Sequence, residues 1–179
     1  AMLLCTPSSI EAKTRAKTRD ALNDGALSFG DVLECFDTRL DLSELHPFAR
    51  WITPTVERRR YDTHFFLTVA EPHEIGLHDQ REVTAGDWMD PAVSVREAEA
   101  GNIILPPPTL HTLLLLADCD SIEAALALCP ATPPTIQPVF SQETFPTLAL
   151  PGDPLHPVSE AVLPGPTRFE LRDGRWQVP

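Results

Sequence analysis

Proline is the residue that most constrains how this chain can fold. The 179 residues include 19 prolines, and most of them lie at residues 106–108, 130–138 and 146–166. Proline has no backbone N–H and its ring disrupts the interior of a helix, so the last third of the chain is predicted to form short strands and turns. We expect residues 131–179 to be a proline-rich β extension packed on the same domain as residues 1–130.

The first half of the chain carries signals for two helices and then a change to strand periodicity. Residues 8–24 are helix-like and end at Gly25, and Ser28 with Asp31 has the spacing of a capping box that opens a second, short helix. These helices are predicted to form a helical insertion over residues 8–40. Residues 46–54 and 61–70 are rich in aromatic and β-branched residues, which predicts an antiparallel hairpin with a buried second strand. A third strand is expected at residues 83–89.

Three helices are predicted between residues 91 and 129. Asp90-Pro91 is a helix start, with Asp90 as the N-cap and Gly101 after the last residue. Residues 107–108 open a leucine-rich helix that should lie in the core, and Asp120 is expected to cap the third helix. Short strands are then expected at residues 135–140, 147–150, 167–172 and 176–178, with Asp173-Gly174 as a hairpin turn.

Charge and composition exclude several classes of function. The net charge of −12 arises entirely from residues 61–179, so most of the surface would repel nucleic acid. No run of 18 apolar residues is present, and no basic-then-apolar segment opens the chain, so neither a membrane span nor a secretory signal is predicted. The four cysteines form no C-x-x-C pair, which favours reduced thiols and a cytoplasmic protein.

Two groups of residues could carry chemistry. Arg58, Arg59 and Arg60 precede Asp62, and arginine side chains suit the recognition of phosphate, although such a cluster can also be an exposed hairpin turn. Residues 71–82 hold several metal-ligand side chains whose spacing matches no standard site, so a solvated acidic loop is the favoured alternative. These are Glu71, His73, Glu74, His78, Asp79 and Glu82. Neither a nucleophilic serine motif nor a glycine-rich phosphate loop is present.

The order of several segments closely resembles part of the Nudix hydrolase superfamily, in the branch related to coenzyme A diphosphatases. WITP at residues 51–54 and RRYDTHFF at residues 59–66 resemble a strand pair of that branch. WMDP at residues 88–91 and PPT at residues 107–109 resemble its two following helix entries. LPGDPLHP at residues 150–157 and RFELRDGRW at residues 168–176 resemble its C-terminal part. The resemblance implies a mixed α/β (α+β) fold with helices flanking the sheet.

Membership would imply hydrolysis of a diphosphate linked to a nucleoside, such as CoA or acyl-CoA, with Mg²⁺ or Mn²⁺. The Nudix box that holds those metals, G-x5-E-x7-R-E-U-x-E-E-x-G-U, is absent from the 179 residues. The closest string, at residues 96–101, lacks the paired glutamates. Because residues 1–5 match the segment that follows the box, we expect a truncated Nudix-like domain that is inactive alone. A catalytically silent binding module and an unrelated metal enzyme using residues 73–82 are the alternatives.

The resemblance also implies roles for particular residues. Arg59 and Arg60 are expected to bind phosphate or acidic groups, and Asp62 to position polar parts of the substrate. Trp51 and Phe66 could line an apolar wall, although packing in the core is the favoured interpretation. Glu82 is a candidate auxiliary metal ligand, with simple exposure as its alternative. An incomplete sheet would expose strand edges, so a homo-oligomer or a complex with the missing N-terminal portion is expected.

Overall fold

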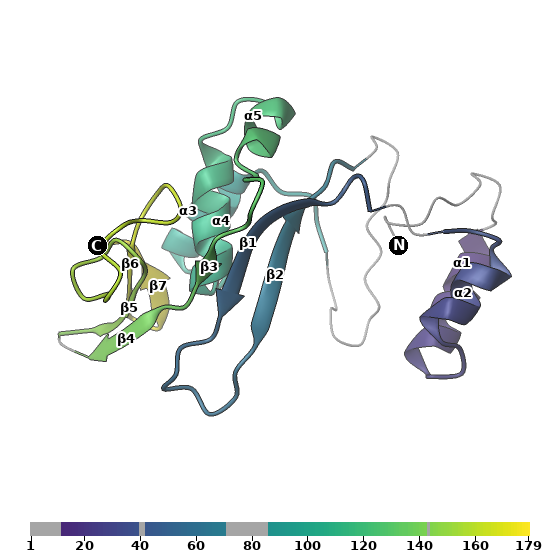
Figure 1. Ribbon diagram of the computed structural model, residues 1–179, viewed down its shortest axis with the longest axis horizontal. Helices are drawn as coiled ribbons and strands as arrows, with labels where there is room; N and C mark the ends of the chain where they lie inside the picture. Colours follow the sequence, from purple (N-terminus) through teal and green to yellow (C-terminus); the bar gives the residue numbers. More distant parts are fainter. Residues whose placement is uncertain (1–11, 40–41, 71–85, 143) are drawn as a thin grey trace. The chain divides into compact units, whose positions relative to one another are not determined.

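The chain forms two compact units, residues Ala1–Leu45 and His46–Pro179. The computed structural model, drawn in Figure 1, describes residues 12–39, 42–70, 86–142 and 144–179. Glu82 and the rest of the acidic segment therefore lie outside the described residues. The boundary expected at residue 130 stays a prediction.

The first unit contains the two predicted helices, α1 (Ala12–Asn23) and α2 (Phe29–Cys35). The capping box is present: the Ser28 backbone N–H donates to Asp31 Oδ2 at 2.7 Å, and the Asp31 N–H donates to Ser28 Oγ at 3.2 Å. These bonds satisfy backbone groups that the first turn leaves without helical partners. Val32 is the buried residue of α2.

The second unit opens with a mixed three-stranded sheet in the order β2-β1-β3. β1 (His46–Ile52) and β2 (Asp62–Leu67) form the predicted antiparallel hairpin, while β3 (Thr135–Ile136) pairs with β1 in parallel. The central strand β1 holds the buried residues Phe48, Ala49 and Trp51. The pairing of Arg50 with Thr135 thus joins strands that lie more than 80 residues apart in the chain.

Two expectations for this sheet are wrong. β2 is not a buried strand, because it lies at the edge of the sheet and its side chains are exposed or half-buried. Its aromatic residues alternate between two faces, and only one of those faces packs on the rest of the unit. No strand forms at residues 86–89, and residues 83–85 lie outside the described part of the chain.

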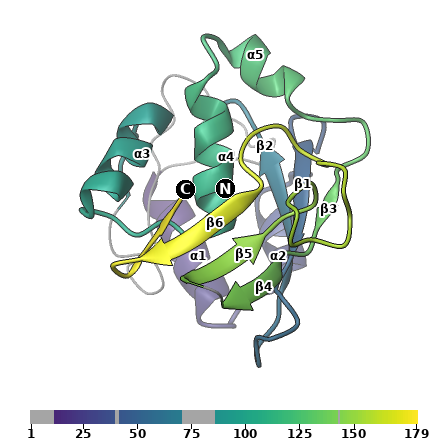
Figure 2. The same ribbon diagram turned by 90° about the vertical axis from the view of Figure 1, so that its left-hand side faces the viewer.

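Three helices follow, and local signals set their starts. In α3 (Pro91–Ala100) the Asp90 carboxylate accepts from the Val93 N–H, as the Asp90-Pro91 pair predicts. α4 (Pro107–Ala117) is the leucine-rich helix, and Figures 1 and 2 both place it between α3 and the three-stranded sheet. α5 (Ile122–Ala127) is capped by Ser121 and not by Asp120, because Ser121 has the extended backbone of an N-cap and its Oγ accepts from the Ala124 N–H.

The proline-rich segment forms a second sheet, antiparallel throughout, in the order β4-β5-β6-β7. The strands are β4 (Val139–Gln142), β5 (Pro146–Ala149), β6 (Arg168–Arg172) and β7 (Arg175–Gln177). β6 and β7 are joined by the predicted turn, in which Asp173 and Gly174 both have positive φ, 50° and 74°. Such angles are typical of two-residue turns that match the twist of the strands.

One hydrophobic core joins the two sheets and the helices of the second unit. Phe48, Ile136 and Phe169 are almost fully buried in it, together with Leu110 and Leu115 of α4. The predicted fold class, mixed α and β with helices flanking a mixed sheet, is confirmed. Among the described helices, none has the length and apolar character needed to cross a membrane.

The loop between β5 and β6 is held by an ion pair between a half-buried arginine and a buried carboxylate. Arg168 donates to both carboxylate oxygens of Asp153, at 2.7 and 2.8 Å, and Asp153 is 3% exposed. The side-chain hydrogen bond from Arg168 lowers the pKa of Asp153. Gly165 has φ +90°, which favours glycine, and a Cβ there would lie 3.0 Å from Leu115 Cδ2, so this loop approaches α4 closely.

Two phenylalanines on strands test where the core lies. Phe169→Ala removes a ring that is fully buried between the sheets, so we expect the free energy of unfolding to fall by about 3–5 kcal/mol. Phe66→Ala removes a ring that is 46% exposed and should cost well under half as much. Urea unfolding of both variants measures this. Equal losses would contradict the placement of the core.

Candidate functional site

A groove of about 540 Å³ lies in the second unit between the β1–β2 hairpin, the first turn of α4 and the second sheet. Trp51, Thr63 and Phe65 line it from the three-stranded sheet. The register places Thr63 opposite Trp51 and Phe65 opposite Ala49, so these side chains share one face. The volume is within the usual range of small-molecule sites, roughly 300–1,000 Å³. The groove is therefore the candidate binding site of the described residues.

The turn at residues 53–61 forms the mouth of the groove. The Thr53 N–H donates to the Tyr61 carbonyl at 3.0 Å, and the Tyr61 N–H donates to Thr53 Oγ1 at 2.9 Å. Arg60 Nε donates to the Thr53 carbonyl at 3.0 Å, which ties the end of the turn to its start. The Arg59 guanidinium lies 5.4 Å from the centre of the Tyr61 ring and lines the groove with it. A positive charge and an aromatic ring thus stand together at the entrance.

The outer face of the same hairpin has a different chemistry. Arg50 makes a two-pronged ion pair with Asp62, with Nε 2.7 Å from Oδ1. Both side chains are exposed, and the hydrogen bond from Arg50 lowers the pKa of Asp62. The His64 and Phe66 rings stack beside this pair, with centroids 6.4 Å apart. Because residues alternate along a strand, these groups face away from Trp51 and Phe65.

The structure places the four predicted site residues differently from one another. Arg59 lines the groove, and Arg60 supports the turn through its bond to Thr53. Asp62 is paired with Arg50 on the opposite face of the hairpin and does not line the groove. Glu82 lies outside the described residues. The substrate roles of Arg59, Arg60 and Asp62 therefore stay proposals, and Arg59 has the position that suits one best.

Sequence reasoning missed the far wall of the groove. Phe140, Leu148 and Trp176 reach it from three strands of the second sheet, and Trp176 lies 125 residues after Trp51 in the chain. No local spacing links these residues to the hairpin. Tyr61 could have been found, because an aromatic residue directly after an arginine cluster is a ready partner for a guanidinium.

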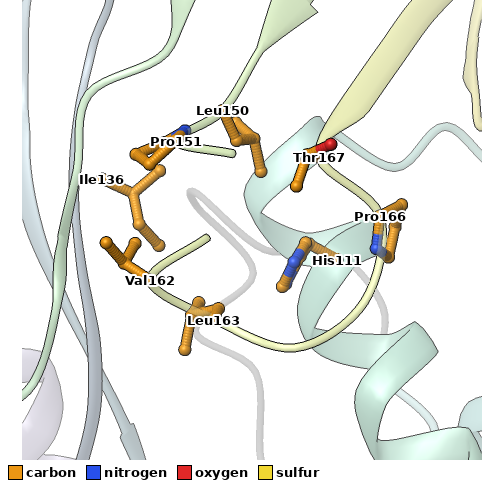
Figure 3. Close-up of a pocket in the computed structure, with 8 residues that line it drawn as sticks. All are labelled: His111, Ile136, Leu150, Pro151, Val162, Leu163, Pro166 and Thr167. Carbon is orange, nitrogen blue, oxygen red and sulfur yellow. The ribbon is translucent and has the colours of Figure 1, made fainter. Parts of the chain in front are cut away.

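His111 is a buried histidine behind the groove. It projects from α4 into a small pocket of about 10 Å³ under the loop that carries Pro166 (Figure 3), a space for roughly one water molecule. Its ring meets that of Trp51 edge-on at 5.8 Å and that of Phe169 at 6.0 Å. Burial lowers the pKa of His111 to about 4, so the side chain is neutral near pH 7 and serves packing.

Neither His111 Nδ1 nor Trp51 Nε1 has a hydrogen-bond partner among the described residues, and both atoms are buried. Trp51 Nε1 is a donor, and a neutral imidazole carries one donor and one acceptor nitrogen. Leaving such groups without a partner costs free energy, so this is the least satisfied part of the core.

The described residues do not form a metal site. No group of three or more histidine, cysteine, aspartate or glutamate side chains comes together within residues 12–39, 42–70, 86–142 and 144–179. Asp62 is paired with Arg50 and Asp153 with Arg168. These donors therefore do not fit a divalent cation, and no step of a reaction is derived through one.

A mixed sheet flanked by helices agrees with the fold that the sequence resemblance implies. The model of the NUDT19 Nudix domain family matches residues 2–116, and the chain belongs to that family. It is 29% identical over 117 residues to the human (Homo sapiens) acyl-coenzyme A diphosphatase NUDT19, covering 64% of this chain and 31% of the human protein.

A second relative has the same name. The Xenopus laevis acyl-coenzyme A diphosphatase NUDT19 is 29% identical over 73 residues, covering 38% of this chain and 19% of that protein. The chain thus spans less than a third of the length of either relative. No solved structure matches it significantly.

The titration of His111 gives a test of its burial. The unfolded chain binds a proton with the ordinary pKa of 6.5, whereas the folded chain does so near pH 4. The free energy of unfolding should therefore fall as the pH drops from about 6.5 to about 4, by about 3 kcal/mol. In His111→Gln this part of the slope should disappear, measured by urea unfolding between pH 7 and pH 4.

Two carboxylates act mainly below that window. The pKa values of Asp62 and Asp153 are lowered, so the stability that they add is lost mostly as the pH falls through and below the ordinary aspartate value. An unchanged slope in His111→Gln between pH 6.5 and pH 4 would show that the histidine is not buried as a neutral side chain.

Proposed function

We propose that this chain forms the substrate-binding part of a Nudix-type hydrolase that cleaves the diphosphate of a CoA-type molecule, with acyl-CoA as the substrate class. Two observations support this. The chain belongs to the NUDT19 Nudix domain family, and both relatives above are named acyl-coenzyme A diphosphatases. The groove with Arg59 at its mouth is a site of suitable size for part of such a molecule.

In this proposal Arg59 contacts the negatively charged part of the substrate. Its guanidinium is held over the Tyr61 ring at the end of a turn that Arg60 and Thr53 brace. A guanidinium fixed in this way loses less side-chain freedom when it binds an anion than a free side chain would. Arg60 and Asp62 act through the shape of the hairpin, Arg60 by its bond to Thr53 and Asp62 by its pair with Arg50.

The chemical step needs groups that the described residues do not bring together. Divalent metals, generally used by Nudix enzymes, polarise a diphosphate and activate water when bound by clustered carboxylates. The 179 residues contain no Nudix box, and the described ones contain no metal cluster. We therefore propose that the 179 residues alone do not catalyse hydrolysis. A catalytically silent binding module is the alternative. It is favoured by the missing Nudix box and by the lack of a metal cluster among the described residues.

Association with another polypeptide belongs to the same proposal. Trp88 and Ile104 are large apolar side chains that are 71% and 76% exposed, and β2 is an edge strand with the exposed Phe66. Such surfaces commonly mark contacts between chains. The proposed partner is a second copy of this chain or a polypeptide that carries a Nudix box.

The activity of the isolated chain is the first test. Purified 179-residue protein, incubated with CoA or an acyl-CoA and with Mg²⁺ or Mn²⁺, is expected to give no cleavage of the diphosphate above the rate without protein. Chromatographic detection of products measures this. Turnover would contradict the proposed inactivity. If Glu82→Gln then lost this turnover while the control Asp87→Asn kept it, Glu82 would be required for the reaction, as a metal ligand would be.

The role of Arg59 is the second test, and it uses binding so that it does not depend on turnover. Arg59→Ala should weaken the binding of CoA by about tenfold, because a charge-assisted hydrogen bond is lost. Arg59→Lys keeps the charge and should lose less. Arg96→Ala, an exposed arginine of α3 that does not line the groove, is the matched control. Equal affinities of the Arg59→Ala and Arg96→Ala variants would remove Arg59 from the site.

A further inference from the structure

We propose that the groove is an acyl-chain site, which takes up the hydrocarbon chain of a fatty acyl group while the charged part of the molecule stays at the turn of residues 53–61. The inference rests on the proposed function in one respect only, that the acyl group is then carried as a CoA thioester. The family match assigns no groove, and four residues of its far wall, Pro138, Phe140, Leu148 and Trp176, lie beyond the matched residues 2–116.

The side chains of the interior favour a hydrocarbon. Trp51 and Phe65 form one side of the groove, and Phe140, Leu148 and Trp176 form the other. All five are buried or half-buried, so water in the groove has few polar groups to bond. A chain of methylene groups that displaces this water gains the hydrophobic free energy of its own surface and of the surface that it covers.

The first turn of α4 disfavours the alternative of a phosphate inside the groove. Helix N-termini bind phosphate through free backbone N–H groups. Here the first turn presents Pro106, Pro107 and Pro108, which have no N–H, and all three line the groove. Pro106 is also the N-cap and makes no side-chain cap hydrogen bond. This end of the helix is thus an apolar wall, although its position is one where phosphate would otherwise bind.

The charges at the mouth orient the ligand. Arg59 lines the groove at its entrance, and the exposed Arg58 precedes it in the same turn. Glu57 is the one acidic side chain among the described lining residues. Val56 and Tyr61 are 59% and 54% exposed there, so an apolar path leads from the arginines into the groove. A molecule with an anionic head and an apolar tail therefore fits, with its head at the arginines of the mouth and its tail in the apolar interior.

The dependence of affinity on chain length tests this with the whole 179-residue protein. Calorimetric titrations with CoA, butanoyl-CoA, octanoyl-CoA and dodecanoyl-CoA are compared. Affinity should rise by about fourfold for each methylene that is buried, until the groove is full. Dodecanoate is titrated as a second probe, because it carries the chain without CoA.

Two neighbouring residues of β2 provide a matched pair of variants. Thr63→Trp places a large ring in the groove from an exposed position, so it should remove the chain-length dependence without emptying the core. His64→Trp adds the same ring on the opposite face of the strand and should keep the dependence. Far-ultraviolet circular dichroism and the unfolding midpoint show whether both variants are folded. Retention of the dependence in a folded Thr63→Trp would overturn the inference.

The probes separate this inference from the proposed function. If CoA and all its thioesters bind equally well, the acyl-chain site is overturned and CoA recognition stands. If dodecanoate binds and Thr63→Trp blocks it, while CoA and its thioesters do not bind, the acyl-chain site stands and the CoA-type substrate falls. If dodecanoate does not bind and no thioester binds more tightly than CoA, the groove does not take up acyl chains.

Discussion

The second unit depends on a run of three aromatic rings that crosses it. Trp51 of the first sheet meets His111 of α4, and His111 meets Phe169 of the second sheet, at centroid distances of 5.8 and 6.0 Å. Rings packed in this way bury large areas and hold their neighbours at fixed separations. These contacts link the two sheets through α4, and Trp51 also lines the groove.

This arrangement explains why one hairpin has two unlike faces. The face with Trp51 and Phe65 is tied to the core and lines the groove, whereas the opposite face carries the Arg50–Asp62 ion pair. Exposed ion pairs add little to stability, typically ~0–1 kcal/mol. The inner face therefore supplies most of the packing free energy of the hairpin.

The proposed function separates binding from chemistry. Recognition of an apolar chain and an anionic head needs a shaped groove and an arginine, and the described residues have both. Cleavage of a diphosphate needs carboxylates clustered around a metal ion, and the described residues have no such cluster. The family match and the groove therefore bear on what is bound, and the activity measurements bear on what is done to it.

Local features were readable from the sequence because their causes act over a few residues. The Ser28–Asp31 capping box, the helix start at Asp90-Pro91 and the turn at Asp173-Gly174 each depend on one side chain or one backbone angle nearby. The cap of α5 was misplaced by one residue, since Asp120 and Ser121 are both good caps and only the backbone angles distinguish them.

The sequence by itself determined the hairpin, the starts of α2 and α3 and, through the family that its motifs resemble, the mixed fold class. Only the tertiary structure decided that Arg59 stands at the groove while Asp62 turns to Arg50, and that Trp176 lies across from Trp51. It also decided that β2 is an exposed edge. The physical reason is that the groove and the exposure of β2 depend on packing between strands far apart in the chain. No periodicity or motif within one strand encodes which surface of another strand it will meet, or which face of the hairpin stays in solvent and carries the Arg50–Asp62 pair.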